Sequence, residues 1–164
     1  MKKNKGFSLV ELIIVIAIMA ILAAAIAPAL IRYIDKSRKA DDVTAAGTIA
    51  TAVNTSLANE SAYDAYAIAG DNVVLMTASA TQKGDSFKWV AAGTYGNGEN
   101  KVFQDEVNSN LSGSAPQVKY KKDAGKGKPA TWAIKVSNDK PIVLLSTDTG
   151  NTYELSPTID ASYQ

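Results

Sequence analysis

The sequence predicts an α+β protein in which a long N-terminal α-helix packs against a C-terminal antiparallel β-sheet. Three observations predict this fold class. Residues 12–31 contain no charged side chain, and residues 43–57 carry apolar side chains at helical spacing. The chain after residue 70 is rich in glycine, proline and short runs of alternating polarity. The predicted order is therefore one long helix followed by a β-rich domain.

The uncharged run is long enough to cross a membrane. A helix rises about 1.5 Å per residue, so residues 12–31 would span about 30 Å, the thickness of bilayer hydrocarbon. The lysine-rich residues 1–6 precede the run and are expected to stay in the cytoplasm. A cleaved secretory signal is the alternative, because residues 25–27 fit a small-x-small pattern. Pro28 directly afterwards disfavours that cut.

Beyond the membrane, the helix is expected to continue over residues 35–70. The apolar stripe recurs at intervals of three and four and consists of Val43, Ala46, Ala50, Val53 and Leu57. Gly70 is the expected terminator. Pro28 lacks the helical N–H donor, so we expect a kink or local unwinding there.

Four alternating or apolar runs predict the strands of a meander that packs on the stripe. They lie at residues 117–121, 132–136, 142–145 and 152–155. Residues 137–141 and 148–151 have the composition of turns. A short helix is expected over 101–111, where Phe103, Val107 and Leu111 recur at intervals of four.

The chain has no cysteine, no histidine and a formal net charge of +1. These absences exclude disulfides, thiol nucleophiles, zinc ribbons, imidazole bases and histidine-ligated metals. The near-neutral charge gives no overall attraction to nucleic acid. We therefore expect a protein that is not an enzyme and holds no metal or other cofactor.

The segment Lys5-Gly6-Phe7-Ser8-Leu9-Val10-Glu11-Leu12, followed by the apolar run and Pro28, resembles the N-terminus of type IV pilins and pseudopilins. The resemblance covers about the first 40 residues and implies cleavage between Gly6 and Phe7 by a membrane-embedded prepilin peptidase. It also implies methylation of the new Phe7 amine. The divisions that follow are a prepilin leader at 1–6, a transmembrane assembly helix at 7–34, its amphipathic continuation at 35–70 and a globular β-rich head at 71–164.

Glu11 and Pro28 gain expected roles from the same resemblance. A carboxylate in hydrocarbon is costly unless a cation compensates it. In pilin-like assembly that cation is the Phe7 amine of a neighbouring subunit, which would set the axial register. On its own, Glu11 would be interpreted as a carboxylate at the lipid headgroup boundary. The region of Pro28 is expected to loosen on assembly.

The function implied is a structural subunit of a type IV pilus. It would be a cytoplasmic-membrane precursor that an assembly platform extracts into a surface homopolymer for adhesion, motility or DNA uptake. A pseudopilin of a secretion or competence system is one alternative, and a tethered or secreted ligand-binding domain is another. Cysteine-free pilins are typical of Gram-positive Firmicutes, which implies a clostridial-type envelope. Residues 151–164 are then expected to be held by strand pairing and packing alone.

A cluster of lysines follows residue 118 and has two interpretations. Its members are Lys119, Lys121, Lys122, Lys126 and Lys128. Lysines on an edge strand are commonly solvated and discourage aggregation. The alternative is contact with DNA or acidic glycans.

Overall fold

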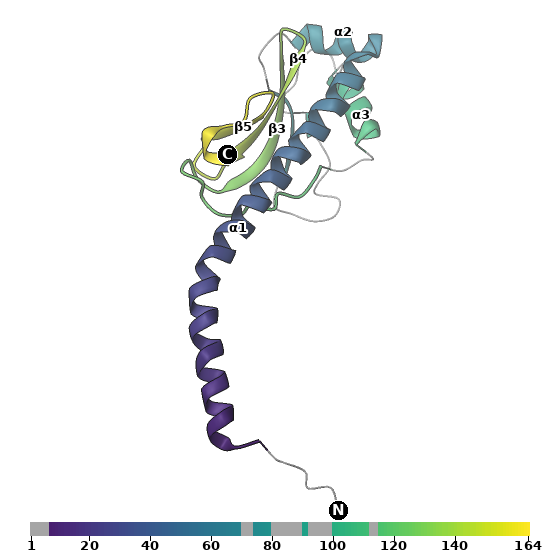
Figure 1. Ribbon diagram of the computed structural model, residues 1–164. Coiled ribbons are helices and arrows are strands. Elements are labelled where there is room, and N and C mark those ends of the chain that lie inside the picture. Colours follow the sequence, from purple (N-terminus) through teal and green to yellow (C-terminus); the bar gives the residue numbers. More distant parts are fainter. Residues whose placement is uncertain (1–6, 70–73, 80–89, 92–99, 112–114) are drawn as a thin grey trace, which may run out of the picture. The chain divides into compact units, whose positions relative to one another are not determined.

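The computed structural model describes residues 7–69, 74–79, 90–91, 100–111 and 115–164 (Figure 1). The chain divides into two compact units, Met1–Ser37 and Arg38–Gln164. Helix α1 (Leu9–Leu57) contributes to both of them. We call them the N-terminal unit and the C-terminal unit.

The N-terminal unit contains the apolar part of α1. Its best window of 18 residues has a mean hydropathy of 3.0, which by length and composition is enough to cross a membrane. None of that window is buried, whereas a core helix of a soluble protein would be mostly covered. The helix runs through Pro28 without interruption, so the local unwinding expected there is absent.

The long helix ends earlier than its composition predicts. Instead of one helix over 35–70, α1 ends at Leu57 and a separate helix, α2 (Glu60–Ala69), follows. Asn59 is the reason, because its side-chain oxygen accepts hydrogen bonds from the N–H groups of Ser61 (3.1 Å) and Ala62 (3.4 Å). Asparagine is a favoured N-cap, and it starts a new helix here. The predicted terminator, Gly70, lies outside the described residues.

Among the described residues, the sheet of the C-terminal unit has five antiparallel strands in the order β2-β1-β3-β4-β5. The strands are β1 (Val74–Ser79), β2 (Val90–Ala91), β3 (Pro129–Ser137), β4 (Lys140–Thr147) and β5 (Thr152–Ser156). The meander β3-β4-β5 confirms the predicted strands at 132–136, 142–145 and 152–155. The sequence patterns did not predict β1, which adds to β3 from a distant part of the chain.

The expected strand at 117–121 is wrong, although its burial pattern is right. Val118 and Tyr120 are buried and Lys119 is exposed, as alternation predicts. The segment nevertheless pairs with no strand among the described residues. The N–H groups of Lys119 and Tyr120 donate to the carboxylate of Asp42 on α1 instead.

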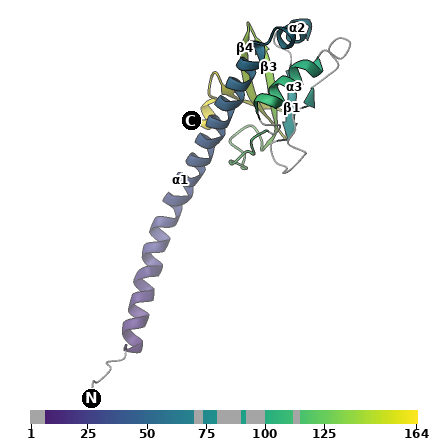
Figure 2. The same ribbon diagram turned by 90° about the vertical axis from the view of Figure 1, so that its right-hand side faces the viewer.

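The core lies between the sheet and the second half of α1, which runs along it (Figures 1 and 2). Ala46 and Val53 of the predicted stripe are fully buried, as are Trp132 and Ile134 of β3. Helix α3 (Asn100–Asn110) confirms the predicted short helix and buries Phe103 and Val107. A 3-10 helix, η2 (Ala161–Tyr163), closes the described chain.

Candidate assembly helix and basic groove

The start of α1 is fixed by a reciprocal pair of hydrogen bonds between Ser8 and the first turn. The N–H of Ser8 donates to Oε2 of Glu11 (2.9 Å), and the N–H of Val10 donates to Oγ of Ser8 (3.3 Å). A serine followed three residues later by a glutamate is a capping box, which satisfies donors that the helix leaves unpaired. This signal is present in the sequence and was overlooked there. Glu11 therefore has a partner within its own chain.

Of the two residues expected to act in processing, Phe7 directly precedes this cap and is 89% exposed, and Gly6 lies outside the described residues. A carboxylate offers about four acceptor positions, so the bond from Ser8 leaves Glu11 able to accept a second donor. Glu11 can therefore pair with a cation and still accept the capping hydrogen bond from Ser8.

A groove of about 660 Å³ lies between α1 and the segment after Pro116. Its lining residues are Arg38, Asp41, Gln117, Val118, Lys119, Lys121 and Lys122. All four cations among them are exposed. The groove thus contains three of the five lysines that the sequence grouped, together with an arginine from α1. We call it the basic groove.

Asp42 joins the two walls of the basic groove. It is 1% exposed, and its oxygens accept from the N–H groups of Lys119 (2.7 Å) and Tyr120 (3.0 Å). Burial raises the pKa of its carboxyl from 3.8 to about 6, and the two backbone donors oppose that rise. The buried carboxyl thereby fixes where the lysine segment lies against α1.

Lys126 and Lys128 do not line the basic groove. The Nζ of Lys126 forms an ion pair with Asp160 at 2.5 Å and lies 5.8 Å from the centre of the Tyr153 ring. The structure therefore does not gather the five lysines into one surface. Lys126 instead serves to hold the chain after β5.

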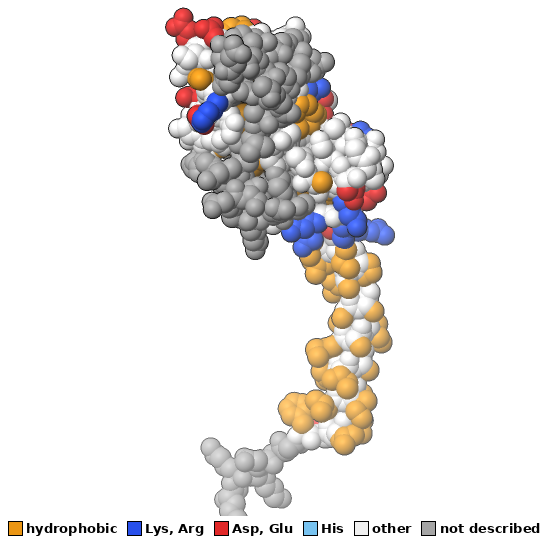
Figure 3. All heavy atoms as spheres, turned by 180° about the vertical axis from the view of Figure 1, so that it is seen from behind, with side chains coloured by type: hydrophobic (Ala, Val, Ile, Leu, Met, Phe, Trp, Pro, Cys, Tyr) orange, Lys and Arg blue, Asp and Glu red, His pale blue; other side chains and the backbone are white. Residues whose placement is uncertain are grey.

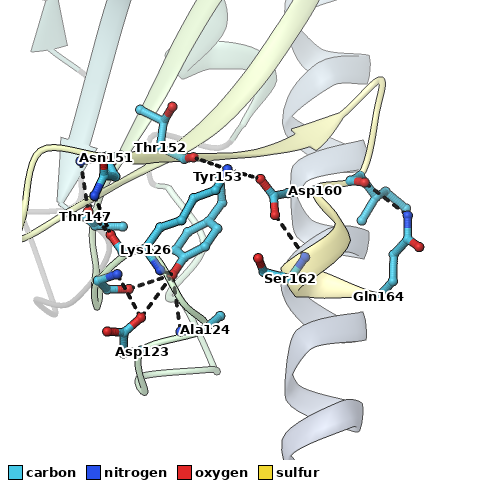
Figure 4. Close-up of polar contacts among 12 residues, drawn as sticks. Asp123, Ala124, Lys126, Thr147, Asn151, Thr152, Tyr153, Asp160, Ser162 and Gln164 are labelled. Atoms are coloured by element: carbon cyan, nitrogen blue, oxygen red, sulfur yellow. Dashed lines mark hydrogen bonds and ion pairs between the residues drawn. The ribbon is translucent and has the colours of Figure 1, made fainter.

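Tyr153 of β5 organises a network of polar contacts (Figure 4). Its hydroxyl accepts from the N–H groups of Ala124 (3.2 Å) and Lys126 (2.8 Å) and donates to the carbonyl of Gly127 (2.8 Å). The carboxylate of Asp123 accepts from the N–H of Gly127 as well, which lowers the pKa of that carboxyl. One buried tyrosine thus holds an irregular loop in place.

The carbonyl of Lys126 is a second centre of the same network. It accepts from Oγ1 of Thr147 (3.0 Å), Oγ1 of Thr149 (2.7 Å) and Nδ2 of Asn151 (3.1 Å). We call residues 123–128 and their partners on β4, β5 and the turn between them the polar clasp. It corrects the expectation that residues 151–164 are held by strand pairing and packing alone.

No group of three Asp or Glu side chains close enough to hold a metal occurs among the described residues. The carboxylates of Asp42 and Asp123 accept hydrogen bonds from backbone N–H groups, which is a structural role. The features that the described residues form are therefore the helix cap at Ser8, the basic groove and the polar clasp.

Comparison with known proteins adds two matches. Residues 1–27 match the family model described as the prokaryotic N-terminal methylation motif. The chain is also 38% identical over 78 residues to a fimbrial protein of Moraxella nonliquefaciens. These matches support a type IV pilin-like protein. No solved structure matches it.

The second match covers 47% of this chain, and the chain spans about half (51%) of the length of that curated relative. The pilin-like resemblance noted in the sequence is therefore confirmed. The matched residues 1–27 include Gly6, Phe7 and Glu11. Neither match is to an enzyme. The Gram-positive origin stays a prediction.

Proposed function

We propose that this chain is the structural subunit of a type IV pilus. The observation that carries the proposal is the methylation motif at residues 1–27, which leads directly into an apolar helix that the structure leaves uncovered. A helix exposed on all sides needs either lipid or other helices around it. A membrane precursor and a helical homopolymer provide these two environments in turn.

The precursor would be anchored in the cytoplasmic membrane by α1 and cleaved between Gly6 and Phe7 by a prepilin peptidase. Methylation of Phe7 and extraction by a membrane assembly platform would follow, and the subunit would end in a filament on the cell surface. The exposure of Phe7 supports this order of events, because a peptidase must reach the bond before it.

Glu11 would pair with the Phe7 amine of a neighbouring subunit and so set the register between apolar helices. Its capping bond to Ser8 supports the pairing, because it fixes the carboxylate at the first turn of α1. Pro28 would supply a weak point in the helix. It removes one backbone hydrogen bond from a helix that the structure shows as continuous.

Mass spectrometry of the N-terminus from cells that carry the pilus machinery tests the processing step. We expect a methylated Phe7 start for the wild type and an intact leader for Gly6→Leu, whose side chain would obstruct an extended substrate in a protease cleft. Asn4→Leu is the matched control and should be processed normally. A start at Pro28 or an unprocessed wild-type chain would contradict the proposal.

Electron microscopy of sheared surface material tests assembly. Glu11→Gln keeps an acceptor for the N–H of Ser8 but removes the charge, whereas Ser8→Ala weakens the cap and keeps the charge. We expect filaments from Ser8→Ala and few or none from Glu11→Gln. Normal filaments from Glu11→Gln would refute charge pairing. A processed chain that never forms long filaments would favour a pseudopilin.

A further inference from the structure

One residue that lines the basic groove, Arg38, follows the apolar run closely in sequence. Arg38 stands on α1 seven residues after Ile31, the last residue of that run, and begins the C-terminal unit. At about 1.5 Å per residue, its backbone lies about 10 Å beyond the end of the run. The headgroup layer of a bilayer adds about 5–8 Å on each side of the hydrocarbon, so its outer edge lies slightly short of the Arg38 backbone. The arginine side chain is long enough to reach back to the headgroups.

The three lysines of the groove are held beside Arg38 by a specific contact. Asp42, one helical turn after Arg38, accepts the backbone N–H of Lys119 at 2.7 Å. That bond uses the main chain of Lys119 and leaves its ammonium group exposed, as those of Lys121 and Lys122 are. The groove therefore combines four cations with one lining carboxylate, Asp41.

We propose that the basic groove binds the headgroups of anionic phospholipids in the outer leaflet of the membrane that α1 spans. Each basic side chain near an anionic membrane surface favours binding roughly fivefold. Lipid is favoured over nucleic acid because the groove is joined to the membrane helix by a few residues, whereas the formal net charge of the chain is only +1. The contact would hold the C-terminal unit close to the bilayer until the subunit is extracted.

The proposal rests on the membrane insertion of α1 that the proposed function requires. It adds a lipid preference that such insertion does not need. Figure 3 shows Lys and Arg side chains as blue spheres on one face of the molecule. Of the five clustered lysines named in the sequence, Lys126 and Lys128 are outside the groove and are expected to contribute little.

The test uses the full chain in nanodiscs. Because the chain has no cysteine, Gln117→Cys places a single fluorophore on the groove wall. A headgroup quencher in the nanodisc then reports how close the groove lies to the lipid. We expect stronger quenching when the zwitterionic lipid is partly replaced by phosphatidylglycerol. Raising the ionic strength from about 0.1 to about 1 M, which shortens the Debye length from about 10 to about 3 Å, should remove the difference.

Matched charge variants identify the residues responsible. Replacing Lys119, Lys121 and Lys122 by glutamine should abolish the response to phosphatidylglycerol. Replacing three exposed lysines outside the groove, Lys101, Lys128 and Lys140, removes the same charge and should leave the response unchanged. Loss of the response in both triple variants would show a general charge effect and overturn the proposal.

Three further outcomes also overturn it, for different reasons. If the chain inserts into nanodiscs but phosphatidylglycerol has no effect, the lipid site is wrong and the pilin assignment is untouched. If a short DNA duplex binds in zwitterionic nanodiscs, and only the groove variant loses that binding, the groove contacts nucleic acid. A chain that fails to insert at all refutes the membrane anchor itself, and the lipid site with it.

Discussion

The carboxylate of Asp42 on α1 accepts a hydrogen bond of 2.7 Å from the backbone N–H of Lys119, which lies 77 positions further along the chain. Tyr120 donates to the other oxygen of the same carboxylate. The bond joins a helix to an irregular segment that no strand supports among the described residues. Two backbone donors of a buried segment therefore depend on one side chain, which makes Asp42 a sensitive position.

Asp42→Ala should destabilise the C-terminal unit. The change leaves the N–H groups of Lys119 and Tyr120 without their acceptor, at a cost of about 2 kcal/mol or more in the free energy of unfolding. Urea denaturation of the full chain in micelles at pH 7, followed by tryptophan fluorescence, measures this. The exposed neighbour in Asp41→Ala should change stability by less than about 0.5 kcal/mol. Equal effects of the two substitutions would contradict the role of Asp42.

The free energy of unfolding should fall as pH rises through the titration of Asp42. Its pKa is about 6 in the fold against an ordinary value of 3.8, so the folded state binds the proton more tightly. The stabilisation is complete below about pH 4 and is lost as pH passes about 6, with a limit of roughly 3 kcal/mol.

Asp42→Asn cannot titrate and should lack this component of the pH profile. The difference in unfolding free energy between wild type and Asp42→Asn should therefore change between about pH 4 and 6 and be flat above about pH 7. The N–H groups of Gly127 and Gly125 lower the pKa of Asp123, which therefore titrates at lower pH. Because both proteins contain Asp123, its contribution cancels in the difference between their unfolding free energies. A constant difference across the range would show that Asp42 does not titrate in this window.

The same substitution at two neighbouring tyrosines should give different results. Tyr153→Phe removes the hydroxyl that holds Ala124, Lys126 and Gly127, and we expect a loss of about 2–3 kcal/mol. The buried hydroxyl of Tyr163 has no hydrogen-bond partner in the part of the chain that the structure describes. Tyr163→Phe should therefore be neutral or stabilising. Thermal unfolding of both variants decides the matter, and a larger loss at Tyr163 would contradict the polar clasp.

Two glycine-to-alanine changes should shift stability in opposite directions. Gly127 has φ +109°, and an added Cβ would lie 2.9 Å from Asp148 Oδ1 and closer still to Thr149 Oγ1. Gly127→Ala should cost about 2 kcal/mol or more. Gly47 lies inside α1 with open space around it, so Gly47→Ala should stabilise by about 1 kcal/mol. Denaturant midpoints provide the comparison, and a tolerated alanine at 127 would mean that the loop can rearrange.

Local patterns predicted most elements of the fold. The spacing of Val43 to Leu57 identified the buried face of α1, and the alternation around Trp132 and Tyr153 identified β3 and β5. Patterns failed where a single side chain decided between alternatives. Asn59 divided the expected helix in two, and Asp42 replaced the expected strand at 117–121.

The candidate site was predictable to a similar extent. The motif around Gly6, Phe7 and Glu11 is contiguous in sequence, so it could be recognised without a structure. The basic groove could not be, because Arg38 and Lys119 come together only through long-range folding. The five lysines looked alike in sequence, but three of them line the groove, whereas Lys126 pairs with Asp160 and Lys128 lies outside the groove.

The contact between Lys39 and Ser162 has a consequence for how the chain folds. The Nζ of Lys39 donates to the carbonyl of Ser162 at 2.6 Å, across 123 positions of sequence. Contacts of such long range raise the contact order and slow folding, because a large loop must close before the contact forms. During synthesis, the C-terminal unit must therefore wait for η2 to emerge before it can complete its core.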